Sequence, residues 1–312
     1  MNVTTTSFST NFLANISQLE ARQSTLQNEA TTGLKVQEPE DDPAVMNQVL
    51  NLQTEASADT QYQSNITQLT DSATTASDAL NSLQTIVEDA SEIATEAGGV
   101  DSSTQLSTYA TQVGQLIQEA VQLGNTKDAN GNYIFGGTNT GNPPFTAATD
   151  ASGNVTSVTY NGNTSVAKSE IAPGLTVSAQ SVGENNTGAG ASGVFADSRT
   201  GADIFNDLIS LQQNLTSGNT SAISTTNTPA LSKDEDNVVT QISANGVLQS
   251  TLEAAGTTTT QQTTALDTQM SNDTNADLAQ TLTLLDQTQT AYQATLQSGV
   301  MVASLSLLDF LQ

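Results

Sequence analysis

The feature that most constrains the fold is an apolar seam that runs from Val45 to Ala97. Apolar residues recur along it at steps of three and four, the spacing of one helix face, and only Asp59 and Gln63 interrupt it. Asp42-Pro43 supplies a helix start signal before the seam, and Gly98-Gly99 supplies a stop after it. At about 1.5 Å per residue this helix is about 80 Å long. The chain is therefore predicted to form an elongated rod of long antiparallel helices.

Further helical patterns complete the predicted rod. A second helix over Leu106–Leu123 folds back on the first, and we interpret the seam from Val45 to Leu123 as an internal core. Helical spacing returns at Ile204–Leu215 and, after a predicted loop around Ser217–Pro229, at Val238–Met270. A run of threonines at 257–260 weakens the helix prediction locally, because β-branched side chains lose rotamer freedom in helices.

The middle of the chain changes from helical spacing to alternation, which predicts a small antiparallel β insertion. A short strand is expected at Tyr133–Gly137, and a glycine-rich stretch at 183–193 is expected to close the insertion as a loop. Three further strands joined by tight turns at Asn161-Gly162 and Pro173-Gly174 are expected at Val155–Tyr160, Val166–Ile171 and Leu175–Ala179. The fold class is thus mainly α with a small β insertion, and the predicted domains are 1–42 and 271–312 (terminal, coiled-coil-like helices), 43–127 and 197–270 (helical rod), and 128–196 (β domain).

The two ends of the chain are amphipathic helices. Each carries an apolar stripe that a single helix leaves exposed, at about 1.5 to 3 kcal/mol for each aliphatic side chain that remains unburied. We expect these stripes to pack against each other and against neighbouring copies, and to be disordered in the free monomer. The candidate assembly residues are Phe8, Phe12, Ile16, Leu19, Leu26, Leu278, Leu282, Leu285, Tyr292, Leu296, Leu305, Leu308, Phe310 and Leu311.

The charge of the chain excludes two classes of partner. Lys and Arg number only 6 against 32 Asp and Glu, which gives a formal net charge of -26, and the cations are scattered singly. Phosphate recognition needs clustered cations, so neither nucleic acid nor an anionic membrane surface is an expected partner. The sequence also shows no Sec-type signal peptide and no apolar run long enough to span a bilayer.

Catalysis is not expected, because the chain has neither Cys nor His to supply a thiolate or an imidazole base. No cofactor or metal is expected either. The acids Glu38, Glu40, Asp41 and Asp42 are interpreted as a capped, solvated linker rather than a cation site. The segment 128–132 faintly matches a calcium-binding loop but lacks its spacing and its bidentate Glu, so we interpret it as a turn.

Several stretches resemble the flagellin superfamily, in the form carried by hook-associated proteins. Thr32-Gly-Leu-Lys-Val followed by Glu38-Pro-Glu-Asp-Asp-Pro43 is similar to the N-terminal signature of that family, and Gly33, Asp41, Asp42 and Pro43 are the residues taken from it. Asn130–Thr138 with Pro143-Pro-Phe145 resembles a central motif, and Ser304–Leu311 resembles the C-terminus. Asp41-Asp42-Pro43 most resembles the hook-associated protein 3 family, whereas Asn275-Ala-Asp277 follows the family's acidic pattern only loosely.

The resemblance implies a flagellin-like fold and a structural role at the junction between the hook and the filament of the bacterial flagellum. It implies export, unfolded, through the flagellar type III apparatus with a flagellar export chaperone. The implied partners outside the cell are further copies in a ring, hook-associated protein 1 and flagellin. Two alternatives stay open: a flagellin that forms the filament itself, and a secreted coiled-coil adhesin.

Overall fold

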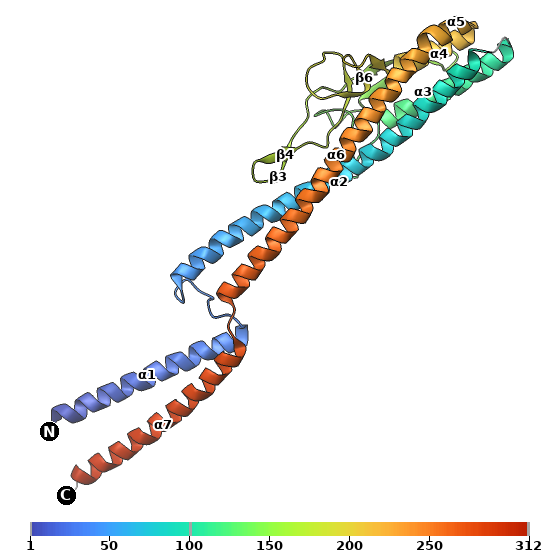
Figure 1. Ribbon diagram of the computed structural model, residues 1–312. Coiled ribbons are helices and arrows are strands. Elements are labelled where there is room, and N and C mark those ends of the chain that lie inside the picture. Colours follow the sequence, from blue (N-terminus) through green and yellow to red (C-terminus); the bar gives the residue numbers. More distant parts are fainter. Residues whose placement is uncertain (1, 100–101, 311–312) are drawn as a thin grey trace. The chain divides into compact units, whose positions relative to one another are not determined.

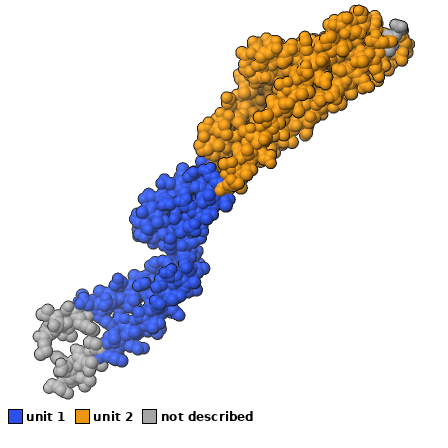
Figure 2. Space-filling model, viewed as in Figure 1, with its two compact units in different colours: residues 1–58, 262–312 blue, residues 59–261 orange. Residues whose placement is uncertain are grey.

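The computed structural model describes the backbone of residues 2–99 and 102–310, and the side chains of residues 10–99 and 102–301. The chain divides into two compact units (Figure 2). Unit 1 contains residues 1–58 and 262–312, and unit 2 contains residues 59–261. Both are mainly helical, and the strands all lie in unit 2, which confirms the predicted fold class.

Unit 1 is built on the two terminal helices. Helix α1 spans Asn2–Thr32, and helix α7 spans Leu278–Phe310. The two helices lie side by side, with the two chain ends at the same end of the pair (Figure 1). The predicted pairing of the terminal helices is therefore confirmed. The remainder of unit 1 comprises the first part of α2 (Pro43–Ala97) and the last part of α6 (Thr228–Thr274).

Unit 2 contains the rest of α2 and α6, together with α3 (Ser103–Gly124) and α4 (Ile204–Ser217). The predicted seam is its core, because the apolar residues of α2 and α3 that face inward are buried. The hydroxyl of Tyr109 also ties the two helices together by donating to Glu96 Oε2 at 2.9 Å. The buried members of the seam in unit 2 include Ile66, Leu69, Ala73, Ala76, Leu80, Leu83, Val87, Ala90, Ala94, Leu106, Val113 and Ala120.

Two helical predictions need correction. The expected loop at 217–229 is instead mostly helical, as α5 (Thr220–Ala222) and a π-helix, η1 (Ile223–Asn227). Its local order comes from a buried amide, because Asn227 accepts from Asn214 Nδ2 at 2.8 Å and donates to Ser210 Oγ at 3.1 Å. Asp59 does not interrupt the buried face either, since its own side chain is buried.

The threonine run at 257–260 lies inside α6 without a break. Two of its hydroxyls donate to backbone carbonyls one turn earlier: Thr258 to Ala254 at 2.9 Å and Thr260 to Gly256 at 2.8 Å. Thr259 of the same run is buried, so tertiary packing overrides the low helix propensity of these residues.

The β insertion consists of three small sheets. The first pairs β1 with β2, and the second pairs β3 with β4, both antiparallel. In the third, β6 pairs in parallel with β5 and antiparallel with β7. The strands are β1 (Phe145–Thr149), β2 (Val155–Tyr160), β3 (Ser169–Ala172), β4 (Leu175–Val177), β5 (Val182–Asn185), β6 (Gly193–Asp197) and β7 (Ala202–Asp203).

The strand predictions are confirmed in part. Strand β2 has its predicted bounds, and the Pro173-Gly174 turn joins β3 to β4 as expected. The turn at Asn161-Gly162 does not form a hairpin, because β2 pairs with the preceding strand and Asn161 N–H donates to Pro144 O at 2.7 Å. The segment 133–137 forms turns with isolated bridges instead of a strand. The glycine-rich stretch is a loop at residues 186–192, as expected, but its ends belong to β5 and β6.

Aromatic side chains join the β insertion to the helices. Phe135, Phe145, Phe195 and Phe205 form one buried cluster, with ring centroids 4.8 to 5.3 Å apart in the contacting pairs. A Cβ placed at Gly124 of α3 would lie 2.6 Å from the Phe145 ring, so the glycine makes room for this contact. Four of the seven phenylalanines of the chain thus lie where the β insertion meets α3 and α4.

A second, smaller cluster fixes the β3–β4 hairpin. Ile171 of β3 is fully buried in it, together with Ile66 and Leu69 of α2 and Leu252 of α6. The side chain of Asn65 supports the same contact by donating to Glu170 O at 2.8 Å.

Candidate assembly interface on the terminal helices

The contact between α1 and α7 depends on small and polar residues of α7. The Tyr292 hydroxyl donates to Glu20 Oε1 at 2.9 Å, and this hydrogen bond raises the pKa of the phenol. Thr281 is buried and lies 3.4 Å from the Glu29 carboxylate. Gly299 lies against the Phe12 ring so closely that a Cβ at this position would overlap the ring. The side of α7 that faces α1 therefore carries Thr281, Tyr292 and Gly299, and not the row of leucines formed by Leu278, Leu282 and Leu296.

The leucine stripe of α7 stays exposed instead. Leu278, Leu282 and Leu296 are exposed, and so are Val300 and Met301 at the far end of the described side chains. Intervals of 4, 14 and 4 residues place the three leucines and Val300 on one side of the helix. The buried Thr281 lies on a different side of the helix from this stripe. An apolar row of this kind, exposed in the single chain, is typical of a protein interaction surface.

The other candidate assembly residues fall into three groups. Leu26 is buried. Half-buried positions are Phe12, Ile16, Leu19, Leu285 and Tyr292. Five candidates lie outside the residues whose side chains are described: Phe8, Leu305, Leu308, Phe310 and Leu311. Sequence reasoning missed Leu13, which is exposed on α1, as well as Val300 and Met301.

The motif residues between α1 and α2 have local structural roles. Gly33 ends α1 with a φ of 75°, a conformation that glycine adopts without strain. Asp41 Oδ2 accepts from the backbone N–H groups of Gln37 and Glu38 at 2.9 and 3.0 Å, and these bonds lower the pKa of Asp41. Asp42 Oδ1 accepts from the N–H of Ala44 at 3.0 Å and so caps α2, whose first residue is the adjacent proline.

The linker before α7 is bonded to the linker after α1. Lys35 N–H donates to Thr274 O at 2.7 Å, and Ala276 N–H donates to Gly33 O at 2.8 Å. Asp277 then caps α7 by accepting from the N–H groups of Ala279 and Gln280 at 3.0 and 3.2 Å. The loosely matching Asn275-Ala-Asp277 segment is thus a helix cap held against the first linker.

The remaining candidate sites fit structural roles. Among the residues that the structure describes, no group of three or more acidic side chains is arranged to hold a metal ion. Asp128 Oδ1 accepts from the N–H groups of Asn130 and Asn132, both at 2.9 Å, which is the hydrogen bonding of a turn. In the part of the chain that the structure covers, no helix is both long and apolar enough to cross a membrane.

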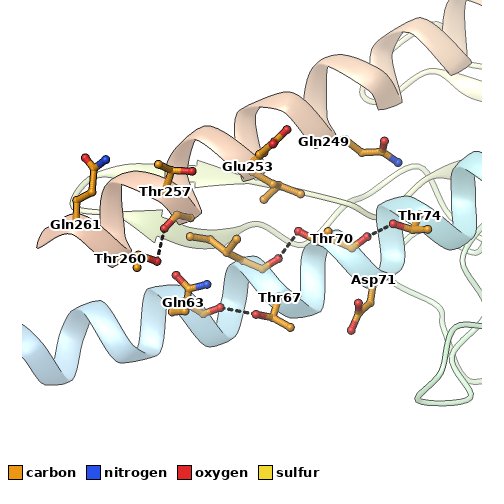
Figure 3. A pocket seen from close by; sticks show the side chains of 13 residues that line it. Gln63, Thr67, Thr70, Asp71, Thr74, Gln249, Glu253, Thr257, Thr260 and Gln261 are labelled. Atoms are coloured by element: carbon orange, nitrogen blue, oxygen red, sulfur yellow. Dashed lines mark hydrogen bonds between the residues drawn. The ribbon is translucent and has the colours of Figure 1, made fainter. Parts of the chain in front are cut away.

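A groove of about 710 Å³ lies between α2 and α6 in unit 2 (Figure 3). Ile66 and Leu252 contribute to its lining, with threonines along both helices. The hydroxyls of Thr67 and Thr70 donate to carbonyls one turn earlier, Gln63 O at 2.9 Å and Ile66 O at 2.8 Å. These two hydroxyl groups donate within their own helix, as threonines on an ordinary helical surface do.

Comparison with known proteins extends these observations. Residues 3–140 match the family described as the bacterial flagellin N-terminal helical region. The match covers less than half of the chain, and through it the chain resembles the flagellin superfamily. The matched residues contain nearly all of α1, the first linker, α2 and α3, so the linker with its Asp41 and Asp42 bonds lies within the matched region.

Individual relatives and solved structures that the chain resembles carry more specific names. The chain is 29% identical to flagellar hook-associated protein 3 of Salmonella typhimurium over 138 residues, a match that spans 44% of this chain and 44% of the relative. It also resembles the structure of a Vibrio parahaemolyticus protein assigned to the flagellar hook-associated proteins, with a TM-score of 0.64 and 21% identity over 75% of this chain and 100% of that one.

The flagellar junction protein FlgL from Legionella pneumophila gives a TM-score of 0.51 at 15% identity, covering 66% of this chain and 99% of that one. At these identities the likeness to both solved structures is one of fold.

Proposed function

We propose that the protein is a structural subunit of the bacterial flagellum, of the hook-associated protein 3 type, and forms the junction between the hook and the filament. The observation that carries this proposal is the exposed leucine stripe of α7, which lies beside the α1 contact and not within it. Because the pairing of α1 with α7 leaves the stripe uncovered, its burial requires another subunit. A flagellin-type chain that keeps such a row exposed is suited to assembly through its terminal helices.

The proposed partners follow from this position. Further copies of the chain would cover part of each stripe in a ring, while hook-associated protein 1 and flagellin would pack on its two sides. The protein would reach this place through the flagellar type III export apparatus, delivered by an export chaperone. It would act outside the cell and mechanically, with the helix caps at Asp42 and Asp277 fixing where the terminal helices begin.

A deletion strain tests the proposal. Removal of the gene is expected to leave hooks in place and to abolish filaments, and expression of the intact chain is expected to restore them. Electron microscopy of the cell surface scores both structures in one image. Normal filaments on the deletion strain would contradict the proposal.

The filament-forming alternative has its own test. A purified subunit of the hook-associated protein 3 type is not expected to form long polymers, because its proposed partners toward the hook and toward the filament are different proteins. Extended homopolymers formed by the purified chain alone would support the flagellin alternative and contradict the junction.

A further inference from the structure

A buried acidic residue of unit 2 has no role in the contacts described so far. Asp234 lies on α6 with no exposed surface, beside Asp207 of α4. Its Oδ1 atom accepts from the backbone N–H of Asp203 at 2.8 Å. Its Oδ2 atom is buried, and no hydrogen-bond donor faces it among the residues that the structure describes. A carboxylate in this position would keep its charge at a large cost in desolvation.

The charged neighbours make ionisation of Asp234 harder. Asp203, which ends β7 and caps α4, already accepts from Asn206 N–H at 3.3 Å, and its charge acts on both carboxyl groups of the pair. Asp207 adds a second negative charge from α4. Lys233 of α6 is the cation beside the group, and it acts on Asp207. A fully buried Asp234 with an unpartnered oxygen, beside the half-buried Asp207, is best satisfied by a proton, because the protonated acid donates to its neighbour.

We propose that Asp207 and Asp234 share one proton in the folded protein, and that this proton holds α4 against α6. Release of the proton leaves two negative charges facing each other inside the helical core, so the contact between α4 and α6 loosens. The pair therefore makes the contact between α4 and α6 in unit 2 depend on pH. This contact does not involve the terminal helices.

The ionisation behaviour of the pair supports this reading. Burial, and then the charge of Asp207, raise the pKa of Asp234 to about 8. Burial, and then the charge of Asp203, raise the pKa of Asp207 to about 6. In the unfolded chain both groups ionise near pH 4. A folded pKa above the unfolded one gives a stabilising contribution that is complete below about pH 4 and is lost as the pH rises to about 8.

The test is the pH dependence of unfolding of the full chain. Because the folded protein holds about one proton more than the unfolded chain between about pH 6 and pH 8, the pair should raise the unfolding constant about tenfold per pH unit in that range. Asp234→Asn keeps the shape and removes the proton, so this part of the slope should disappear. Asp236→Asn, at an exposed position of the same helix, is the matched control and should keep the wild-type slope.

A second measurement keeps the proposal testable if Asp234→Asn does not fold. Carboxyl ¹³C shifts of the wild-type protein, labelled at aspartate, should show one side-chain carboxyl that stays protonated above pH 6, and Asp207→Asn should shift its titration. All aspartates titrating below pH 5, or a slope in Asp234→Asn equal to that of the wild type, would overturn the shared proton. Neither result bears on the assembly proposal, which rests on α7.

Discussion

The exposed leucine stripe of α7 gives a prediction whose magnitude follows from the structure. Leu278, Leu282 and Leu296 are 48%, 55% and 40% exposed, so each has about half of its surface still to bury. Complete burial of a leucine is worth about 1.5 to 3 kcal/mol, which leaves about 1 kcal/mol for each of these side chains. The triple variant Leu278→Gln, Leu282→Gln, Leu296→Gln should therefore lose about 3 kcal/mol of assembly free energy, a weakening on the order of a hundredfold.

Glutamine is chosen because it has nearly the helix propensity of leucine, so α7 itself should stay helical. Assembly is measured by sedimenting the purified chain with hooks isolated from the deletion strain, and the concentration at half-saturation gives the loss. Each substitution should change the free energy of unfolding of the free monomer by no more than about 0.5 kcal/mol, because the changed side chains are exposed. Urea denaturation of the same samples measures that difference.

The matched control is Leu50→Gln on α2. Leu50 is 52% exposed, like the stripe leucines, but it lies outside the terminal helices. It should leave hook binding unchanged. An equal loss from Leu50→Gln, or undiminished binding by the triple variant, would refute the claim that the α7 stripe is the assembly surface.

Three further substitutions test individual contacts. Gly299→Ala should push the Phe12 ring away and speed hydrogen exchange in α7, because the added methyl group overlaps that ring. Phe145→Ala should lower the free energy of unfolding by about 3 to 5 kcal/mol in urea titrations, because it empties the centre of the buried aromatic cluster. Asp42→Ala should cost about 0.5 to 2 kcal/mol and increase exchange at Ala44 N–H, which loses its side-chain acceptor.

Each of these changes has a conservative counterpart. Gly246→Ala on α6 meets open space and should stabilise the helix by up to about 1 kcal/mol. Phe145→Leu should cost less than the alanine, and Asp42→Asn should keep most of the cap. Equal effects from a substitution and its counterpart would contradict the contact assigned to it.

The long helices were predictable from sequence because their apolar spacing extends over many turns. The seam from Val45 to Ala97, with a start signal at Asp42-Pro43 and a stop signal at Gly98-Gly99, predicts the bounds of α2 at Pro43 and Ala97. The strand pairing was harder to predict, because a turn motif in the sequence does not show which strands pair with each other. Asn161-Gly162 looks like a hairpin turn, yet β2 pairs backward with β1 and the glycine instead makes room for the Tyr160 ring.

The functional features were predictable only in outline. The sequence indicates an apolar stripe on the last helix, but it does not say that α1 contacts the side that carries Thr281 and Gly299 and leaves Leu282 exposed. Nor does it pair Asp207 with Asp234, because two acids on separate helices resemble ordinary solvated charges until the fold brings them together. Contacts between distant segments decide both features.

The most direct test of the junction assignment is the position of the protein on intact flagella. The chain contains no Cys, so Ala151→Cys, in the exposed turn between β1 and β2, provides a single thiol for maleimide-linked gold. One band of gold is expected at the boundary between hook and filament in electron micrographs of flagella from the complemented deletion strain. Gold distributed along the whole filament, or absent from the flagellum, would contradict it.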